Sequence, residues 1–301
     1  MNAPIVIFVY NRLKHTKALI NSLEKNPEAK ESVLYIFADG AKNDRDLFAV
    51  NEVQKYIRIV EKDACFRNVD VHIRQRNMGL AASVIEGVSY VFSQYDRVVV
   101  LEDDLVVAEN FLSYMNAALT FYKTDPTIWS ISGYTPELKA LNTYDKDVYA
   151  YYRGCSWGWG TWKDRWNTVD WNVSDFKRLK RDKIARTHFN RGGDDMFDML
   201  WLQQRGVINS WAIRWCYQQS KNNQYTVYPV QTYVENNGMD GSGSNYRKKS
   251  RRDFCIEIKR SDCPVKLEKV SPDKAIADEY RNRFHLSLWT RIKRELKLAL
   301  K

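Results

Sequence analysis

The residues best suited to chemistry are three consecutive acids, Glu102, Asp103 and Asp104. They follow the apolar run 98–101, which predicts a buried strand of a parallel sheet. Ligands of open α/β sheets bind at the carboxyl ends of strands, where these acids would lie. Adjacent carboxylates repel one another, and oxygen ligands suit a hard divalent cation such as Mg²⁺ or Mn²⁺. The triplet equally fits a polar strand end that leads into a helix, with Asp104 or Glu109 as the cap, so alone it leaves both interpretations open.

A second pair of acids, Asp194 and Asp195, follows Gly192 and Gly193. A carboxylate presented by a Gly-Gly turn at the start of a helix could act as a general base. The same pattern is typical of a helix cap, because acids are favoured at helix N-termini, and here the helix would continue to Gln204.

Tryptophans and glycines alternate in the stretch 151–162, which includes Trp157 and Trp159. Glycine allows close approach of the backbone to a ligand, and flat rings suit the apolar face of a sugar. The alternative is a tryptophan-rich segment that packs on the sheet. The polar glycine loop 236–245 would close over a ligand or serve as a connector.

The elements that must position these residues alternate regularly over the first 130 residues. This alternation predicts an α/β fold with a doubly wound, mostly parallel sheet. The chain lacks a Gly-x-Gly-x-x-Gly after the first strand and a Gly-Lys-Ser/Thr loop, which argues against dinucleotide binding and triphosphatase activity. Strands are expected over residues 4–10, 33–38, 69–73, 97–101 and 128–132, and helices over 15–25, 45–61, 79–92 and 110–122.

The pattern changes after about residue 134. A basic helix is expected over 176–189, and further strands over 211–217 and 227–234. We therefore divide the chain into a first half (1–134), a second half (135–246) and a basic extension (247–301).

Charge is concentrated in that extension. Residues 247–301 hold 17 Lys/Arg and 8 Asp/Glu, which is +9 of the total net charge of +10. The predicted helix 284–300 has an apolar and a basic side, as does a helix lying on an anionic bilayer, and the basic run 246–252 would add to it. A helix packed on the domain, or a contact with a partner, is the alternative. Nucleic acid is not expected as a partner, because the rest of the chain is nearly neutral.

Cysteine usage and the termini suggest a compartment. The five cysteines are scattered without a Cys-x-x-Cys pair, which favours reduced thiols over disulfides or a zinc site. No stretch approaches the ~20 apolar residues of a membrane span, and no signal peptide is visible. We expect a cytoplasmic protein, peripheral at the inner face of the plasma membrane if the basic helix binds lipid.

Several motifs in order resemble a known family, the GT-A-fold glycosyltransferases that use nucleotide sugars. The likeness is to the inverting N-acetylglucosaminyltransferase I type and, more generally, to bacterial family 2 enzymes. It covers roughly residues 4–220. The motifs are the first strand with Asn11-Arg12, then Asp39, the segment 76–80, the acids 102–104 followed by Leu105, the turn 154–162, and Asp194-Asp195.

This resemblance implies roles for individual residues. Asp104 would hold Mn²⁺ or Mg²⁺, and Asp194 would be the catalytic base. Trp157, Trp159 and Asp195 would lie on the acceptor or sugar side. The UDP-sugar would be contacted by Val9, Asn11, Arg12, Asp39, Arg76, Asn77, Gly79, Glu102 and Asp103.

The expected function is therefore inverting, metal-dependent transfer from a UDP-sugar to a glycan or lipid-linked glycan, in bacterial surface polysaccharide biosynthesis. A glycoside hydrolase would use acids from the same two clusters without a metal. A nucleotidyltransferase would favour a basic glycine-rich loop after the first strand, which the sequence lacks. A sugar-nucleotide-binding protein without turnover is the alternative outside enzymes.

Overall fold

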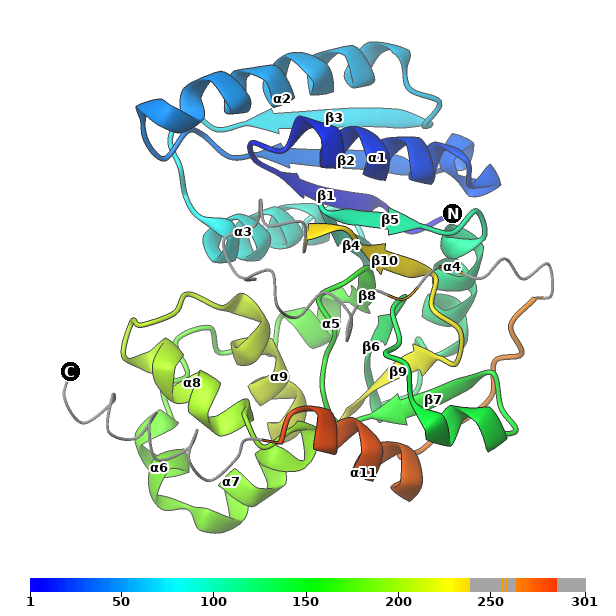
Figure 1. Cartoon of the computed structure of the whole chain (residues 1–301), viewed down its shortest axis with the longest axis vertical. Coiled ribbons are helices and arrows are strands. Elements are labelled where there is room, and N and C mark those ends of the chain that lie inside the picture. The colour runs from blue at the N-terminus through cyan, green and yellow to red at the C-terminus, as the bar shows by residue number, and fades with distance from the viewer. Residues whose placement is uncertain (239–255, 257, 259–263, 286–301) are drawn as a thin grey trace.

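An eight-stranded sheet forms the centre of the protein, as seen in a computed structural model that describes residues 1–238, 256, 258 and 264–285 (Figure 1). The strand order is β3-β2-β1-β4-β8-β6-β9-β7, and β5 pairs with β10 in a separate two-stranded sheet. The strands are β1 (Ile5–Val9), β2 (Val33–Ala38), β3 (Asn68–Ile73), β4 (Arg97–Glu102), β5 (Leu105–Val107), β6 (Ile128–Ser132), β7 (Val148–Tyr151), β8 (Trp159–Trp162), β9 (Tyr225–Pro229) and β10 (Val234–Asn236).

Helices cover both faces of this sheet because β1 is apolar at every position. Ile5, Ile7 and Val9 pack with residues of α1, α2 and α4, whereas Val6 and Phe8 pack with α3 and α9. Successive residues of a strand point to opposite faces, so a wholly apolar strand must be covered twice. The predicted doubly wound α/β fold is confirmed. The helices are α1 (Leu13–Glu24), α2 (Asp44–Asp63), α3 (Leu80–Phe92), α4 (Phe111–Phe121), α5 (Lys163–Trp166), α6 (Phe176–Arg181), α7 (Lys183–Phe189), α8 (Met196–Gln204), α9 (Trp211–Lys221) and α11 (Lys274–Arg283), with short 3₁₀ turns η1 (Pro27–Glu31), η2 (Lys139–Thr143) and η3 (Asn190–Gly192).

The sheet is parallel on one side and mixed on the other. Strands β3, β2, β1 and β4 run parallel, as the β-α alternation predicted. Strand β8 lies antiparallel between β4 and β6, and β7 is antiparallel to β9. One sheet therefore continues through both of the halves that we divided at residue 134.

Three predicted elements of the second half differ from the structure. The expected strand 227–234 is the end of β9 and the start of β10, which belong to different sheets. The segment 211–217 is the start of helix α9, not a strand, because Trp211 and Trp215 are four residues apart on one buried face and the Ser210 side chain caps the helix at Ile213 N, 3.3 Å away. The basic helix 176–189 is two helices, α6 and α7. The break lies at Asp182, whose carboxylate caps α7 by accepting a hydrogen bond from Ala185 N at 2.9 Å.

Most of the basic extension falls outside the described residues. The basic run 246–252 and the predicted helix 284–300 beyond residue 285 lie outside them, as does the predicted glycine loop from residue 239 onward. The part that is described contributes α11, whose Ile276 and Tyr280 pack on the tyrosines of β7 and β9. Within the residues that the structure describes, no helix combines the length and apolar character that crossing a bilayer requires.

Candidate active site

The three acids lie at the carboxyl end of β4 as predicted. Glu102 ends the strand beside Phe8 of β1, and Asp103 and Asp104 form the turn into β5. Arg12, in the loop after β1, donates from Nη2 to Asp103 Oδ1 and, over 3.0 Å, to Asp104 Oδ2. Because β1 and β4 are neighbours in the sheet, these residues, far apart in the sequence, meet at one edge.

The acids carry more negative charge than Arg12 can balance. Burial, together with the charges of Asp104 and Asp103, raises the pKa of Glu102 to about 8, although Arg12 lowers it. Burial also raises the pKa of Asp103, which Arg12 opposes. A second cation at this turn would relieve the repulsion.

These oxygen donors fit a divalent ion that is held mainly by a bound substrate and only in part by the protein. Among the described residues, no three His, Cys, Asp or Glu side chains come together as a cage. Asp104 is accessible enough to bind, with 17% of its side chain exposed. Mg²⁺ typically takes one or two carboxylates together with phosphate oxygens and water, so a single aspartate at this turn suffices.

The chain between β10 and the undescribed loop passes directly over Asp104. Asn237 N donates to Asp104 O at 2.8 Å. A Cβ on Gly238 would lie 2.2 Å from Asp104 Oδ2, so only glycine fits there with this geometry. The start of the predicted glycine loop therefore borders the acidic turn.

A second group of predicted residues lies at the ends of β1 and β2. Asp39 is buried and accepts hydrogen bonds from the backbone of Gly40 (3.1 Å), Met78 (2.8 and 3.1 Å) and Gly79 (2.9 Å). Asn77 donates to Gly40 O at 2.9 Å. Asp39 thus fixes the loop before α3, which Gly79 enters with φ of 77°.

The other predicted nucleotide contacts differ in accessibility. Val9 is buried, so only its backbone is available, and its carbonyl accepts from Asp39 N at 3.2 Å. Asn11 is partly exposed and Arg76 is exposed. Since β1 lies between β2 and β4, the Asp39 loop and the acidic turn flank the same strand end.

The tryptophan stretch divides into a core part and an accessible part. Trp159 begins β8, is 1% exposed and packs against Trp166, Trp211 and Trp215. The expectation that Trp159 contacts a sugar is therefore wrong, because both faces of its ring lie in the core. Trp157 is partly exposed and meets Tyr134 edge-on with ring centroids 4.6 Å apart, so it remains a candidate.

The two acids after Gly193 have different partners. Asp195 forms a bidentate ion pair with Arg153, with distances of 2.7 and 3.1 Å, and its side chain makes no cap hydrogen bond to α8. Asp194 Oδ1 accepts from Arg281 Nε and Nη2 at 2.9 and 2.8 Å, and Oδ2 lies 2.9 Å from His285 Nδ1. Sequence reasoning missed these three partners. A buried arginine requires an acidic partner, but no local sequence pattern pairs Arg153 with Asp195 or Arg281 with Asp194.

Cys155 lies in the turn between Arg153 and Trp157. Burial raises the pKa of its thiol, which also feels the charges of Arg153 on one side and Glu102 on the other. Its neighbour Trp157 precedes Gly158, whose added Cβ would lie 2.7 Å from Val234 of β10. The turn 154–158 therefore packs against β10, the strand that leads to the segment over Asp104.

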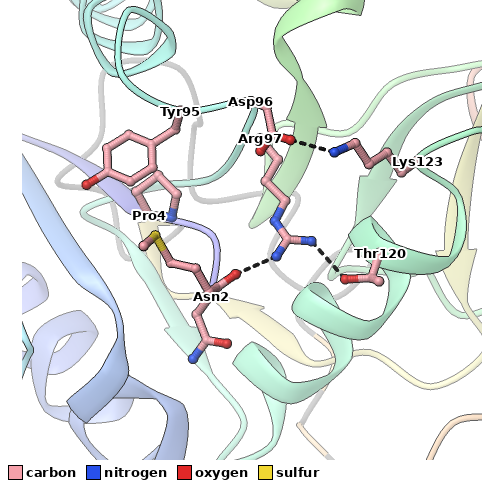
Figure 2. Close-up of a pocket in the computed structure, with 8 residues that line it drawn as sticks. Asn2, Pro4, Tyr95, Asp96, Arg97, Thr120 and Lys123 are labelled. Atoms are coloured by element: carbon pink, nitrogen blue, oxygen red, sulfur yellow. Dashed lines mark hydrogen bonds and ion pairs between the residues drawn. The ribbon is translucent and has the colours of Figure 1, made fainter.

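A surface pocket lies at the opposite edge of the sheet, at the amino ends of β1 and β4 (Figure 2). Its charged groups already have partners. Arg97 donates to Met1 O and to Thr120 Oγ1, and Lys123 pairs with Asp96. None of the residues predicted to contact the UDP-sugar lines this pocket.

Comparison with known proteins supports the sugar-transfer interpretation. A sequence profile described as "GNT-I family" matches residues 2–188. The alpha-1,3-mannosyl-glycoprotein 2-beta-N-acetylglucosaminyltransferase of Arabidopsis thaliana is 29% identical over 103 residues, which are 31% of this chain and 22% of that protein. The chain thus spans about a fifth of the length of this curated relative.

Solved structures resemble the protein only distantly. S. aureus TarS 1–349 matches with a TM-score of 0.41 and 11% identity, over 78% of this chain and 60% of that one. The mannosyltransferase PcManGT of Pyrobaculum calidifontis, in complex with GDP-Man and Mn²⁺, matches with a TM-score of 0.39 and 10% identity, over 73% of this chain and 69% of that one.

Proposed function

The chain belongs to the GNT-I family, and we propose that it transfers a sugar from a UDP-sugar to a hydroxyl group of a glycan or lipid-linked glycan, with inversion at the anomeric carbon. The observation that carries the proposal is the acidic turn at the end of β4, where Arg12 balances only part of the charge. Because the Arabidopsis relative is named an N-acetylglucosaminyltransferase, UDP-GlcNAc is the first donor to test.

The residues divide the work between two sides of the site. Asp104 would hold Mn²⁺ or Mg²⁺. Glu102, Asp103 and Arg12 would keep the Asp104 side chain in position. A bound divalent ion neutralises the charge that develops on a departing diphosphate. Asp39 keeps the loop 76–79 in position beside the nucleoside.

On the acceptor side, Trp157 offers an apolar ring face to a sugar. Asp194 and the residues that it contacts take the proton of the attacking hydroxyl. General base catalysis of this kind is typically worth ~10²–10⁴ in rate. Asp195 holds Arg153 and shapes this side without touching the reacting atoms, since both its oxygens are engaged.

The biological setting is also a proposal. We infer a role in bacterial surface polysaccharide assembly, at the inner face of the membrane, with the basic extension attracted to anionic lipid. The +9 charge of residues 247–301 supports this placement.

A panel of UDP-sugars, scored for UDP release with Mn²⁺, with Mg²⁺ and with EDTA, tests the function. We expect release from one donor only when a divalent ion is present. Metal-independent release of sugar from a glycoside would instead favour the glycoside hydrolase. Binding of UDP without any release from any donor would favour a binding protein that lacks turnover.

A further inference from the structure

The carboxylate of Asp194 is fully engaged by residues of the C-terminal part of the chain. Arg281, on α11, donates twice to Oδ1, at 2.9 and 2.8 Å. His285, just after α11, places Nδ1 2.9 Å from Oδ2. The Asp194 side chain is only 9% exposed, whereas that of His285 is 61% exposed. Of the two side chains here that could accept a proton, the carboxylate and the imidazole, the imidazole is therefore the accessible one.

The hydrogen bond determines which nitrogen of His285 is basic. An ionised carboxylate can only accept, so Nδ1 must be the donor in the bond to Asp194. In a neutral imidazole the lone pair then resides on Nε2. A histidine oriented by a carboxylate through one nitrogen, with the other free to accept a proton, is the arrangement that acid–base catalysis requires.

An imidazole suits the task better than this carboxylate does. A carboxylate beside a guanidinium is stabilised in its charged form and is a poorer proton acceptor than an isolated one. Histidine is also the side chain that proteins use most often as a general base. The ion pair with Arg281 thus favours a positioning role for Asp194.

The end of α11 also lies against the acceptor side of the site. The guanidinium of Arg153 sits 4.1 Å from the centroid of the Phe284 ring. Gly193 adopts φ of 144°, and a Cβ there would lie 3.1 Å from Phe284 Cβ. Phe284 therefore lies against Gly193 and Arg153, and the next residue, His285, contacts Asp194.

We propose that His285 is the proton acceptor of the transfer reaction and that Asp194 is its positioning residue. This inference rests on the function proposed above. The hydroxyl oxygen of the acceptor, or of water, bonds to the anomeric carbon. At the same time the bond between that carbon and the diphosphate oxygen breaks, and the electron pair of the broken bond leaves with UDP. The hydroxyl proton moves to His285 Nε2. The resulting imidazolium is stabilised by Asp194 and later returns the proton to solvent.

The test uses the full chain, the UDP-sugar that the wild-type protein turns over fastest in the panel, and water as the acceptor. His285→Ala should lower UDP release ~10²-fold or more, the scale of general base catalysis, while the affinity for UDP stays unchanged. Added imidazole should restore release to His285→Ala in proportion to its concentration. His285→Gln fills the same space without a base, so it should be equally slow but resist rescue.

Lys274→Ala is the matched control, because Lys274 lies on α11 and is 91% exposed. It should behave as the wild-type protein does. Wild-type rates in His285→Ala, or loss of activity that imidazole does not restore, would overturn the assignment of the proton acceptor while leaving the proposed function intact. Absence of UDP release by the wild-type protein from every donor would instead contradict the proposed function.

Discussion

Arg153 and Asp195 form a bidentate ion pair in which both side chains are largely buried, 15% and 12% exposed. The pair joins the segment after β7 to the start of α8. It explains why two adjacent aspartates have unlike roles, since Asp195 faces a buried cation and Asp194 faces the end of α11. The region that we propose as the acceptor side is thus built by contacts between distant segments.

Breaking this pair should destabilise the fold. Asp195→Leu leaves a buried guanidinium without a partner, and such a loss costs about 3–5 kcal/mol. The double variant Arg153→Met, Asp195→Leu should recover most of that, because it leaves no unpaired charge. Urea unfolding measures both. The exposed pair Lys274–Asp278 is the control, and Asp278→Ala should leave the unfolding free energy nearly unchanged. Equal stability of the single variant and the wild-type protein would contradict this account.

Removing the charge at the acidic turn should abolish metal-dependent activity. Asp104→Asn keeps the shape of the side chain but weakens its hold on a cation, so UDP release should fall by roughly 10²-fold or more, as when one preorganised electrostatic contact is lost. The Mn²⁺ concentration needed for half-maximal release should rise. Asp96→Asn, at the opposite edge of the sheet, should leave both values unchanged. An Asp104→Asn variant with the wild-type response to Mn²⁺ would rule out Asp104 as the ligand.

Adding one methyl group at the nucleoside loop should disturb it. A Cβ on Gly40 would lie 2.6–2.8 Å from three backbone atoms of Arg76, which cannot move aside as a flexible side chain would. Gly40→Ala should cost ~1–3 kcal/mol through overpacking and weaken UDP binding, as read by thermal unfolding and calorimetric titration. Gly206→Ala is the control, because no atom lies within 4 Å of its added Cβ and only its φ of 68° opposes the change. If only stability changed, the loop 76–79 would not contact the nucleotide.

One stabilising carboxylate outside the site should give stability a simple pH dependence. Hydrogen bonds from the Ser174 hydroxyl and from the backbone of Ser174 and Asn172 lower the pKa of Asp170, against the effect of burial. A lowered pKa in the folded state means that the contribution is fully present above the unfolded value and is lost as the pH falls through the folded one. Asp170→Asn should therefore reduce the unfolding free energy at pH 7 but have little effect near pH 2. A penalty of the same size at both pH values would contradict the charge-based explanation.

Residues near one another in the sequence determined the first half of the fold. Alternating apolar runs and amphipathic stretches predicted β1 to β4, β6 and the four helices among them, because a buried strand or a one-sided helix shows its period within a short window. The acids 102–104 could be placed at a strand end for the same reason. Short aromatic segments carry no such signal, so the sequence predicts a strand where α9 forms and does not predict β8.

The partners in the site depended on tertiary structure alone. Arg12 reaches Asp103 and Asp104 because β1 and β4 are neighbours in the sheet, and Arg153 meets Asp195 because the segment after β7 packs on the start of α8. His285 reaches Asp194 from 91 residues away. Ion pairs of this kind leave no periodicity in the sequence, since they are set by where whole elements pack. The sequence by itself therefore determined which acids are available for chemistry. The packing of distant segments decided which basic side chain pairs with each acid.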